Sequence, residues 1–366
     1  MKKEMISPLY AKCIIILFII GSTVVIGVST EARQDAWMTI MIAAAYAVPA
    51  VLMYGRLMKL YPEQGLYEIA EAAAGKVLGK VIIALFTWYA FHLGSLVLRN
   101  FVEFIQVNVL RETPRIAVMI LIMSAVAYLT KSGPKAMGKF SLLFLTVLIV
   151  VVIVTVLGSI NQMEGYYMLP VLATDTAKLL EDGYNVFSFP LAETVLFLTA
   201  AASVRKEDSP YKIYLWSIFA ASIILITIVI RNILILGPAM AGITYFPSYV
   251  AARIINIGEF FARIEGSISM NFIMSGVLKI SVCLFAATTG IAKLAGITNF
   301  KRLILPVSML MMALCEIVYA NLMEMFAWLK IYRFYAAPFQ IILPMLLWIL
   351  AEIKAKKAAR GELPAI

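Results

Sequence analysis

A proline and a glutamate stand near the middle of one apolar segment that is long enough to cross a bilayer. The segment reads N-V-F-S-F-P-L-A-E-T-V-L-F-L at residues 185–198 and contains Pro190 and Glu193. A proline inside a helix removes a backbone hydrogen bond, and hydrocarbon offers no water to the freed groups. A carboxylate at membrane depth costs about 2.5–3.5 kcal/mol and usually marks a binding site or ion pathway. The pattern predicts a broken helix beside an interior cavity. The alternative is a packing kink whose acid bonds to a neighbouring helix.

A second weak helical stretch lies in the first apolar segment. It reads G-S-T-V-V-I-G at residues 21–27. Two glycines and two hydroxyl residues in seven positions lower helix stability, and the free amide groups could face a ligand, although small residues also serve close helix packing. Interrupted segments at corresponding places in two halves of a membrane protein point to a binding site at the midplane. We therefore expect broken first and sixth helices.

The eighth apolar segment carries a polar stripe. Asn271, Ser275 and Lys279 recur every four residues and so share one helical face, which we expect to point into the helix bundle or a cavity. Lys279 lies too deep for its ammonium to reach the membrane surface. Three roles remain open for it: a fixed cation in place of a coupling sodium ion, a proton carrier, or one half of a static ion pair. The predicted cavity residues are Gly21, Ser22, Thr23, Gly27, Ser188, Phe189, Pro190, Glu193, Asn271 and Ser275.

Charged side chains also lie inside the third and ninth apolar segments. Arg99 and Glu103 are i,i+4 neighbours that can pair on one face of a helix, either as a structural pair near the rim or as part of a gate. Glu316 lies in the ninth segment. We assign these residues and Lys279 to ion or proton coupling or to structural ion pairs.

The elements that hold these residues are membrane spans. The chain of 366 residues is 63% hydrophobic and 14% charged, against about 45–50% and about 25% in a soluble domain. This composition predicts an all-α polytopic membrane protein. Ten spans are expected, at residues 12–29, 36–57, 81–105, 115–130, 140–160, 186–204, 213–236, 268–292, 303–322 and 335–353.

The charge distribution predicts the orientation of these spans. An even number of crossings places both termini on one side, and most of the 31 Lys and Arg fall on that side. The positive-inside rule then assigns both termini to the cytoplasm. Five spans in each half require two halves of opposite orientation, that is, two inverted repeats. We expect one membrane domain, with repeat 1 at 12–160, an outer loop at 161–185, repeat 2 at 186–353 and a basic cytoplasmic tail at 354–366.

Several function classes find no support in the sequence. There is no glycine-rich phosphate loop, no metal-spaced cluster of His and Cys, and no nucleophile elbow. We therefore expect no enzyme activity, no metal and no cofactor. The net charge of +10 is a topology signal and an attraction to anionic lipid, not a nucleic-acid surface.

The order of several motifs resembles a known family. D-A-W at 35–37, L-Y-E-I-A-E…G-K-V-L-G-K at 66–80, L-R-N-F-V-E-F-I followed by R-E-T-P, F-P-L-A-E-T-V-L-F-L and F-F-A-R-I-E-G follow one another along the chain. Together they are similar to the endospore germination permeases, the B subunits of spore germinant receptors. The similarity covers about residues 6–356.

The resemblance carries expectations about fold, place and partners. The family belongs to the amino acid–polyamine–organocation superfamily, which implies a LeuT-like fold of ten helices in two inverted repeats around a small-molecule site. It also implies the inner membrane of a spore, a membrane-embedded A subunit and a lipoprotein C subunit. Glu193, the Arg99–Glu103 pair, and Arg263 with Glu265 match the family's motifs by position. The Gly21–Gly27 stretch matches its broken first helix only roughly.

Three functions are compatible with this chain. The first is a receptor subunit that binds a small nutrient germinant, an amino acid by preference, in a midmembrane cavity and helps to trigger germination. The second is a proton-coupled symporter of amino acids or amines, in which Lys279 or Glu193 carries the proton. The third is a scaffold with a vestigial cavity. Transport of a labelled substrate separates the first two, since both use the same cavity.

Overall fold

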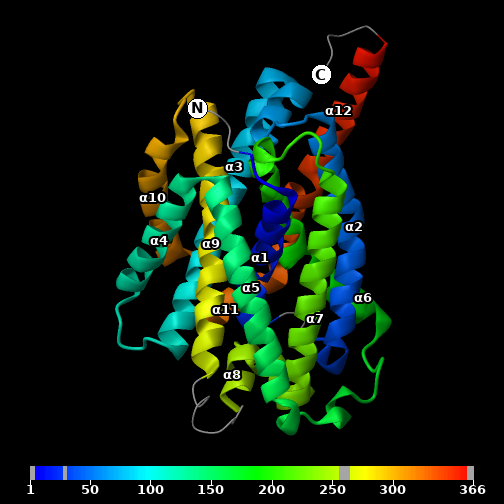
Figure 1. The fold of residues 1–366 in the computed structure, drawn as a ribbon, viewed down its shortest axis with the longest axis vertical. Helices are drawn as coiled ribbons and strands as arrows, with labels where there is room; N and C mark the ends of the chain where they lie inside the picture. Colours follow the sequence, from blue (N-terminus) through cyan, green and yellow to red (C-terminus); the bar gives the residue numbers. More distant parts are fainter. Residues whose placement is uncertain (1–4, 28–30, 255–263, 361–366) are drawn as a thin grey trace.

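The computed structural model describes residues 5–27, 31–254 and 264–360, and these residues form a bundle of long helices (Figure 1). The first half contains α1 (Pro8–Ile26), α2 (Ala36–Leu60), α3 (Leu66–Asn108), α4 (Arg115–Ser132) and α5 (Pro134–Gly158). The second half contains α6 (Thr176–Val186), η4 (Phe187–Leu191), η5 (Ala192–Ser203), α7 (Pro210–Ile243), α8 (Pro247–Ile254), α9 (Ile264–Ala295), α10 (Ile304–Val318), α11 (Leu322–Ala337), η8 (Pro338–Ile342) and α12 (Leu343–Ala359).

The described helices have the length and composition of membrane spans. Eight helical segments are long and apolar enough to cross a bilayer, and one of them joins α6, η4 and η5 into a single segment of 28 residues. The other two expected spans are the shorter helices α1, of 19 residues, and α10, of 15 residues. Each of the ten predicted spans therefore overlaps a helix of the structure. The chain is a multi-pass membrane protein.

The helix ends follow ordinary capping chemistry. Ser7 precedes Pro8 and its hydroxyl accepts a hydrogen bond from the amide of Tyr10, which caps α1. Ser209 and Pro210 begin α7 in the same way. The start of α1 and the end of α12 lie at one end of the bundle, and α8 lies at the other (Figure 1). This agrees with an even number of crossings.

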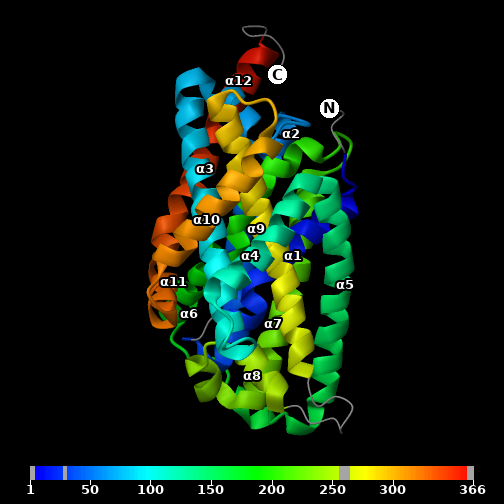
Figure 2. The same ribbon diagram turned by 90° about the vertical axis from the view of Figure 1, so that its left-hand side faces the viewer.

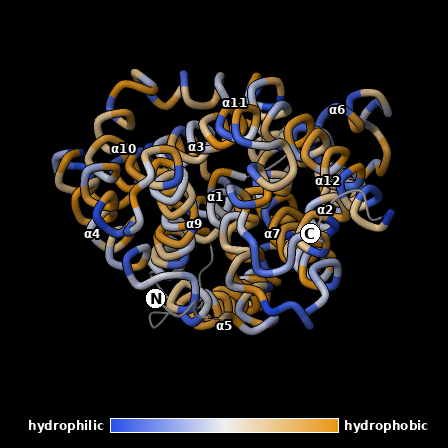
Figure 3. The backbone as a smooth tube through the Cα atoms, turned by 90° about the horizontal axis from the view of Figure 1, so that it is seen from above, coloured by the Kyte–Doolittle hydropathy of each residue, from blue (hydrophilic) through white to orange (hydrophobic). Residues whose placement is uncertain are grey.

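Two membrane segments have most of their residues buried by the rest of the protein. In both the α6–η5 segment and α9, 83% of the residues in the most apolar window are buried, against 22% in α5. Seen along the bundle, α1 lies near the middle with α9, α3 and α7 around it, while α4, α10 and α6 lie farther out (Figure 3). A polar side chain in the buried part of α9 or η5 is therefore enclosed by protein, which is where membrane proteins place ionisable groups.

Two spans differ in extent from the expectation. The last one begins at Leu322 and not near residue 335, because α11, the π-helical turn η8 and α12 form one segment of 38 residues (Figure 2). The predicted interfacial helix at residues 66–80 is joined to the third span as α3, with a kink at Gly75, where φ is 79°. Glycine adopts this left-handed conformation without steric cost.

Candidate functional site

The sixth span is broken where the sequence predicts it. The α-helix α6 ends at Val186 and passes into the π turn η4, in which Phe189 has the extended dihedrals φ −129° and ψ 109°. Pro190 follows, and the chain continues as a 3₁₀ helix from Ala192 to Ser203. Runs of 3₁₀ helix longer than a few residues are uncommon and often mark a functional hinge. The break is thus confirmed.

The glutamate after this break forms a buried ion pair. The Lys279 ammonium, from α9, lies 2.5 Å from Glu193 Oε2, and both side chains have no exposed surface. Tyr332, from α11, donates a hydrogen bond of 2.7 Å to the other carboxylate oxygen, Oε1. Both oxygens of Glu193 therefore have a partner. Three separate spans meet at this one carboxylate, and the partner of Lys279 is established.

Aromatic rings complete the surroundings of the ammonium. Lys279 Nζ lies 5.1 Å from the ring centroid of Phe18, in α1, and 4.9 Å from that of Phe189. These distances fit cation–π contacts, which are worth about 2 kcal/mol or more when desolvated. A carboxylate and two ring faces from the first and sixth spans thus enclose one ammonium from the eighth. We call Phe18, Phe189 and Glu193 the ammonium cage.

A hydrogen-bonded network extends from Tyr332 into the last span. The Tyr332 hydroxyl lies 3.1 Å from that of Tyr89, which accepts from Gln340 Nε2 at 2.9 Å. The same Gln340 amide nitrogen donates to the carbonyl of Ser188, while Ser188 Oγ donates to Gln340 Oε1 at 3.1 Å. The Tyr54 hydroxyl donates to the backbone carbonyl oxygen of Gln340. The π turn η8 is therefore linked by side chains to the break in the sixth span.

A cavity of about 280 Å³ lies next to the ammonium cage, and we call it the vestibule. Its wall includes Gly27 at the end of α1, Asn185 on α6, and Phe189. Charged residues of both signs also line it, among them Glu31, Asp182 and Lys330. Because Phe189 borders the vestibule and also contacts the Lys279 ammonium, a single aromatic ring is shared by the cavity and the buried ion pair.

The expected cavity residues of the first span have several roles. Helix α1 continues through Gly21, Ser22 and Thr23, so the expected interruption at these residues is wrong; helical backbone ends only at Gly27, where φ is 80°. Thr23 Oγ1 donates to the carbonyls of Ile19 and Ile20 and so stays within the helix. Gly27 lines the vestibule, while Ser22 is buried.

Gly21 acts through its lack of a side chain. A Cβ atom at Gly21 would lie 3.1 Å from the Ser275 carbonyl oxygen and 3.3 Å from Lys279 Cβ. Small residues at such contacts let two helix backbones approach closely. The glycine therefore lets α1 pack directly against the turn of α9 that runs from Ser275 to Lys279.

One predicted cavity residue lies apart from this group. Asn271 lines a small separate cavity with Arg231 and Ser248. The buried Arg231 guanidinium donates to Thr155 Oγ1 at 2.8 Å and to Asn232 Oδ1 at 2.7 Å. Arg263 and the side chain of Glu265 lie outside the described residues.

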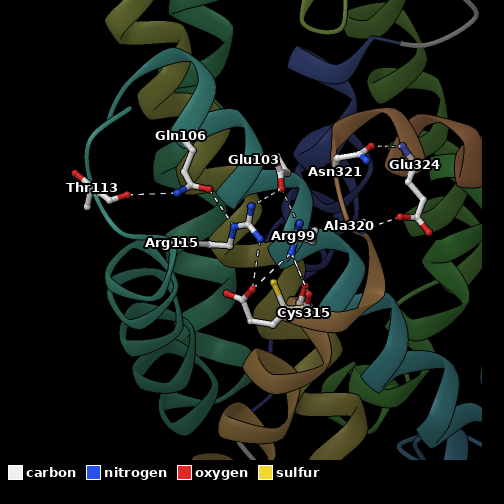
Figure 4. Close-up of polar contacts among 10 residues, drawn as sticks. Arg99, Glu103, Gln106, Thr113, Arg115, Cys315, Ala320, Asn321 and Glu324 are labelled. Carbon is white, nitrogen blue, oxygen red and sulfur yellow. Dashed lines mark hydrogen bonds and ion pairs between the residues drawn. The ribbon is translucent and has the colours of Figure 1, made fainter.

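A second ion-pair group contains Glu316 and the two residues Arg99 and Glu103, which are labelled in Figure 4. The Arg99 guanidinium lies 2.9 Å from Glu103 and 3.9 Å from Glu316, and it donates to the Cys315 carbonyl. Arg115 on α4 also lies 3.4 Å from both acids. These contacts join α3, α4 and α10. The expected pair of Arg99 with Glu103 is present, and its geometry is that of a brace between three helices.

Sequence reasoning missed four side chains of the site: Phe18, Tyr89, Tyr332 and Gln340. Gln340 carried a usable signal, because a glutamine between two apolar stretches of a span needs a partner in hydrocarbon. Tyr332 lay outside the expected tenth span. Aromatic residues are frequent in spans, so Phe18 and Tyr89 carried no distinguishing mark.

Comparison with protein families identifies the group to which this chain belongs. The model of a family described as spore germination protein matches residues 5–350. The chain belongs to the spore germination protein family. Its relatives include spore germination protein KB of Bacillus subtilis, 24% identical over 99% of this chain and 98% of that protein. The putative spore germination protein YfkT of the same organism is 22% identical over 91% of each chain.

The fold is shared with solved transporters. The structure of MhsT in complex with L-phenylalanine matches with a TM-score of 0.71 over 95% of this chain and 89% of that one, at 11% identity. Mhp1, a nucleobase-cation-symport-1 family transporter in a closed conformation with bromovinylhydantoin bound, matches with a TM-score of 0.65 over 100% and 95% of the chains, at 10% identity. The fold is LeuT-like. Family and fold are those of permease-type and transporter-type proteins and not of enzymes.

Proposed function

We propose that this chain is the permease-like subunit of a spore germinant receptor and binds a small nutrient, by preference an amino acid. The observation that carries the proposal is the buried Glu193–Lys279 pair at the break of the sixth span, beside a cavity bordered by Phe189. A buried charge pair is weak evidence for stability alone, because desolvation offsets most of its attraction. Because the pair adds little to stability, we interpret it as part of a binding site for a charged ligand.

The nutrient would act by favouring one arrangement of the helices. A ligand shifts a conformational equilibrium only through different affinities for the two states. The Glu193 carboxylate is joined through Tyr332, Tyr89 and Gln340 to the break in the sixth span and to the π turn of the last span. A ligand that changes the partners of Glu193 would therefore alter contacts between η5 and the α11–α12 segment, which gives it different affinities for the two arrangements.

The proposal also assigns the chain to a membrane and to partner subunits. As a B-type subunit, the chain would lie in the inner membrane of the spore with both termini on the cytoplasmic, core side. It would assemble with a membrane-embedded A subunit and a lipoprotein C subunit. Family membership and the basic residues on the side of the termini support this assignment.

The Glu193→Gln substitution tests the proposal in spores. Glutamine keeps the shape of glutamate but removes the charge, so we expect the nutrient response to be lost. The unpaired Lys279 ammonium should also lower the protein level, so the response is compared at equal amounts of protein. The measurement is germination rate against nutrient concentration, with protein abundance followed by immunoblot. Glu112→Gln is the matched control, because Glu112 is exposed at the turn between α3 and α4. An unchanged response of the Glu193→Gln spores would remove this glutamate from the site.

A second function, proton-coupled symport of amino acids or amines, is favoured by one observation. Lys279, Glu193, Tyr332 and Tyr89 form a continuous chain of ionisable groups inside the bundle. Such chains carry protons in transporters. Gradient-driven uptake of labelled amino acids by proteoliposomes of the purified protein would support symport, whereas binding without uptake would support the receptor.

A further inference from the structure

The groups around the Lys279 ammonium are of the kind that bind an ammonium group in general. The Glu193 carboxylate lies 2.5 Å away, and the rings of Phe18 and Phe189 lie 5.1 and 4.9 Å away. A carboxylate with aromatic faces is the combination that proteins use to bind cationic nitrogen in ligands. The structure shows this combination with a side chain of the protein itself in the position of the ligand.

The cage and its occupant belong to different parts of the fold. Phe18, Phe189 and Glu193 come from the first and sixth spans, and Lys279 comes from α9. The cage does not need the lysine to keep its shape, because Tyr332 holds Glu193 through the other carboxylate oxygen. One member of the cage, Phe189, also lines the vestibule. A small ligand in the vestibule would therefore lie against Phe189, the same ring that contacts the Lys279 ammonium.

We propose that Lys279 is the built-in occupant of an ammonium site and that the ligand is a zwitterionic amino acid that inserts between Lys279 and Glu193. In the bound state the ligand ammonium takes the place of Lys279 against Glu193, and the ligand carboxylate pairs with the released Lys279. This inference deepens the proposed function and rests on it for the route by which the nutrient arrives.

Charge balance selects the zwitterion over other ligands. An amine without a carboxylate would leave the Lys279 ammonium unpaired, and a carboxylic acid without an amine would leave Glu193 unpaired. Removal of one partner from a buried pair is strongly unfavourable, whereas insertion of a zwitterion leaves every charge paired. The vestibule fits such a ligand, since Glu31, Asp182 and Lys330 place both signs of charge along its wall.

Chemical rescue tests the ammonium site directly. Lys279→Ala removes the ammonium and the three methylene groups next to it, which is the outline of n-propylammonium. A cavity formed by truncation can bind a molecule of the lost shape. We expect the melting temperature of purified Lys279→Ala protein in detergent to rise with n-propylammonium concentration. That of the wild type should not change, because Lys279 fills the site.

Two controls separate charge from shape. n-Propanol, with the same carbon chain and no charge, should leave the melting temperature of Lys279→Ala unchanged. The double variant Glu193→Gln, Lys279→Ala should not respond to n-propylammonium, because its cage carries no charge. An equal response to n-propanol, or an equal response of the double variant, would overturn the ammonium site.

The test remains decisive if Lys279→Ala does not fold alone. Its abundance in membranes is then compared between cells grown with and without n-propylammonium. Accumulation with the amine and not without it supports the inference. Absence under both conditions overturns it, because the amine then fails to replace the lysine.

The outcomes also separate this inference from the proposed function. Rescue by n-propylammonium, together with a normal nutrient response of Glu193→Gln spores, would leave the ammonium site standing and refute its use for the nutrient. Loss of response in Glu193→Gln spores without any rescue of Lys279→Ala would refute the inference and leave the proposed function standing.

Discussion

At the residue scale, the organisation of the site depends on how Glu193 is paired. One oxygen contacts Lys279 and the other accepts from Tyr332, and all three side chains are buried. A hydrogen bond to a charged group is worth about 1.5–3 kcal/mol, and loss of one partner leaves the other desolvated and unsatisfied. The tyrosine hydroxyl therefore stabilises the buried carboxylate together with the lysine, by a hydrogen bond and not by charge.

Replacement of Tyr332 by phenylalanine should destabilise the protein and weaken the nutrient response. Tyr332→Phe removes the donor to Glu193 and the contact with the Tyr89 hydroxyl, while the ring packing stays. We expect a loss of about 1.5–3 kcal/mol in the free energy of unfolding. Thermal unfolding in detergent and the germination response to nutrient concentration are the measurements.

Tyr335→Phe is the matched control for this prediction. Tyr335 lies in the same helix, and its hydroxyl is buried without a hydrogen-bond partner in the described structure. Loss of that hydroxyl should leave stability unchanged or raise it. Equal effects of the two substitutions would show that the bond to Glu193 contributes nothing specific.

At the scale of elements, the close approach of α1 and α9 positions the lysine inside the cage. Phe18 on α1 contacts the ammonium, and Gly21, one turn later, lies against the α9 backbone at Ser275. The two features work together, because a wider spacing of these helices would draw Phe18 away from Lys279. A different group, Arg99 with its acids, joins α3, α4 and α10 and so fixes the helices on the other side of α9.

The Gly21→Ala substitution tests this packing. The added Cβ would lie 3.1 Å from the Ser275 carbonyl oxygen, which is backbone and cannot turn away. The helices must then separate by a few tenths of an ångström, and we expect a loss of about 1–3 kcal/mol in stability. Thermal unfolding of the purified protein measures it.

Gly266→Ala in α9 gives the opposite expectation. No atom lies within 4 Å of a Cβ at Gly266, and the residue is exposed. Alanine in a helix is favoured over glycine by about 0.4–1 kcal/mol, so this variant should be neutral or slightly more stable. A Gly21→Ala protein as stable as the Gly266→Ala protein would contradict the role of Gly21.

At the scale of the whole molecule, the sequence predicted the order of the helices better than their contacts. Runs of apolar residues mark the spans, and Pro190 marks the break, because both follow from local chemistry in hydrocarbon. The deep placement of Glu193 and Lys279 indicated buried charges, yet their pairing depends on how α9 packs against η5. The chain alone does not give that packing.

The errors have the same origin. Gly21–Thr23 looked like a helix break from composition, but Thr23 bonds to its own helix and α9 packs against Gly21, so packing overrides weak propensity. Tyr332 escaped notice because the last helical segment begins at Leu322, earlier than the expected span. Gln340 lies inside the expected span, but its bonds to Tyr89 and Ser188 depend on helix packing that the sequence does not give.

The vestibule offers a test of how the whole molecule lies in the membrane. The native cysteines at 13, 283 and 315 are free and buried, so an impermeant thiol reagent should not label the wild type. Asn185→Cys places a thiol on the vestibule wall, and the predicted topology opens this wall to the outer side. We expect labelling of Asn185→Cys from the outside, and slower labelling when nutrient is present.

Ser188→Cys is the matched control, because Ser188 lies one turn farther along the same segment and is buried, with its hydroxyl donating to Gln340. It should stay unlabelled, and the added Phe189→Ala substitution should make it reactive by removing the ring shared by the vestibule and the ion pair. Labelling of Asn185→Cys only from the cytoplasmic side would reverse the predicted orientation. Equal labelling of Asn185→Cys and Ser188→Cys would show that Phe189 does not separate the vestibule from the buried charges.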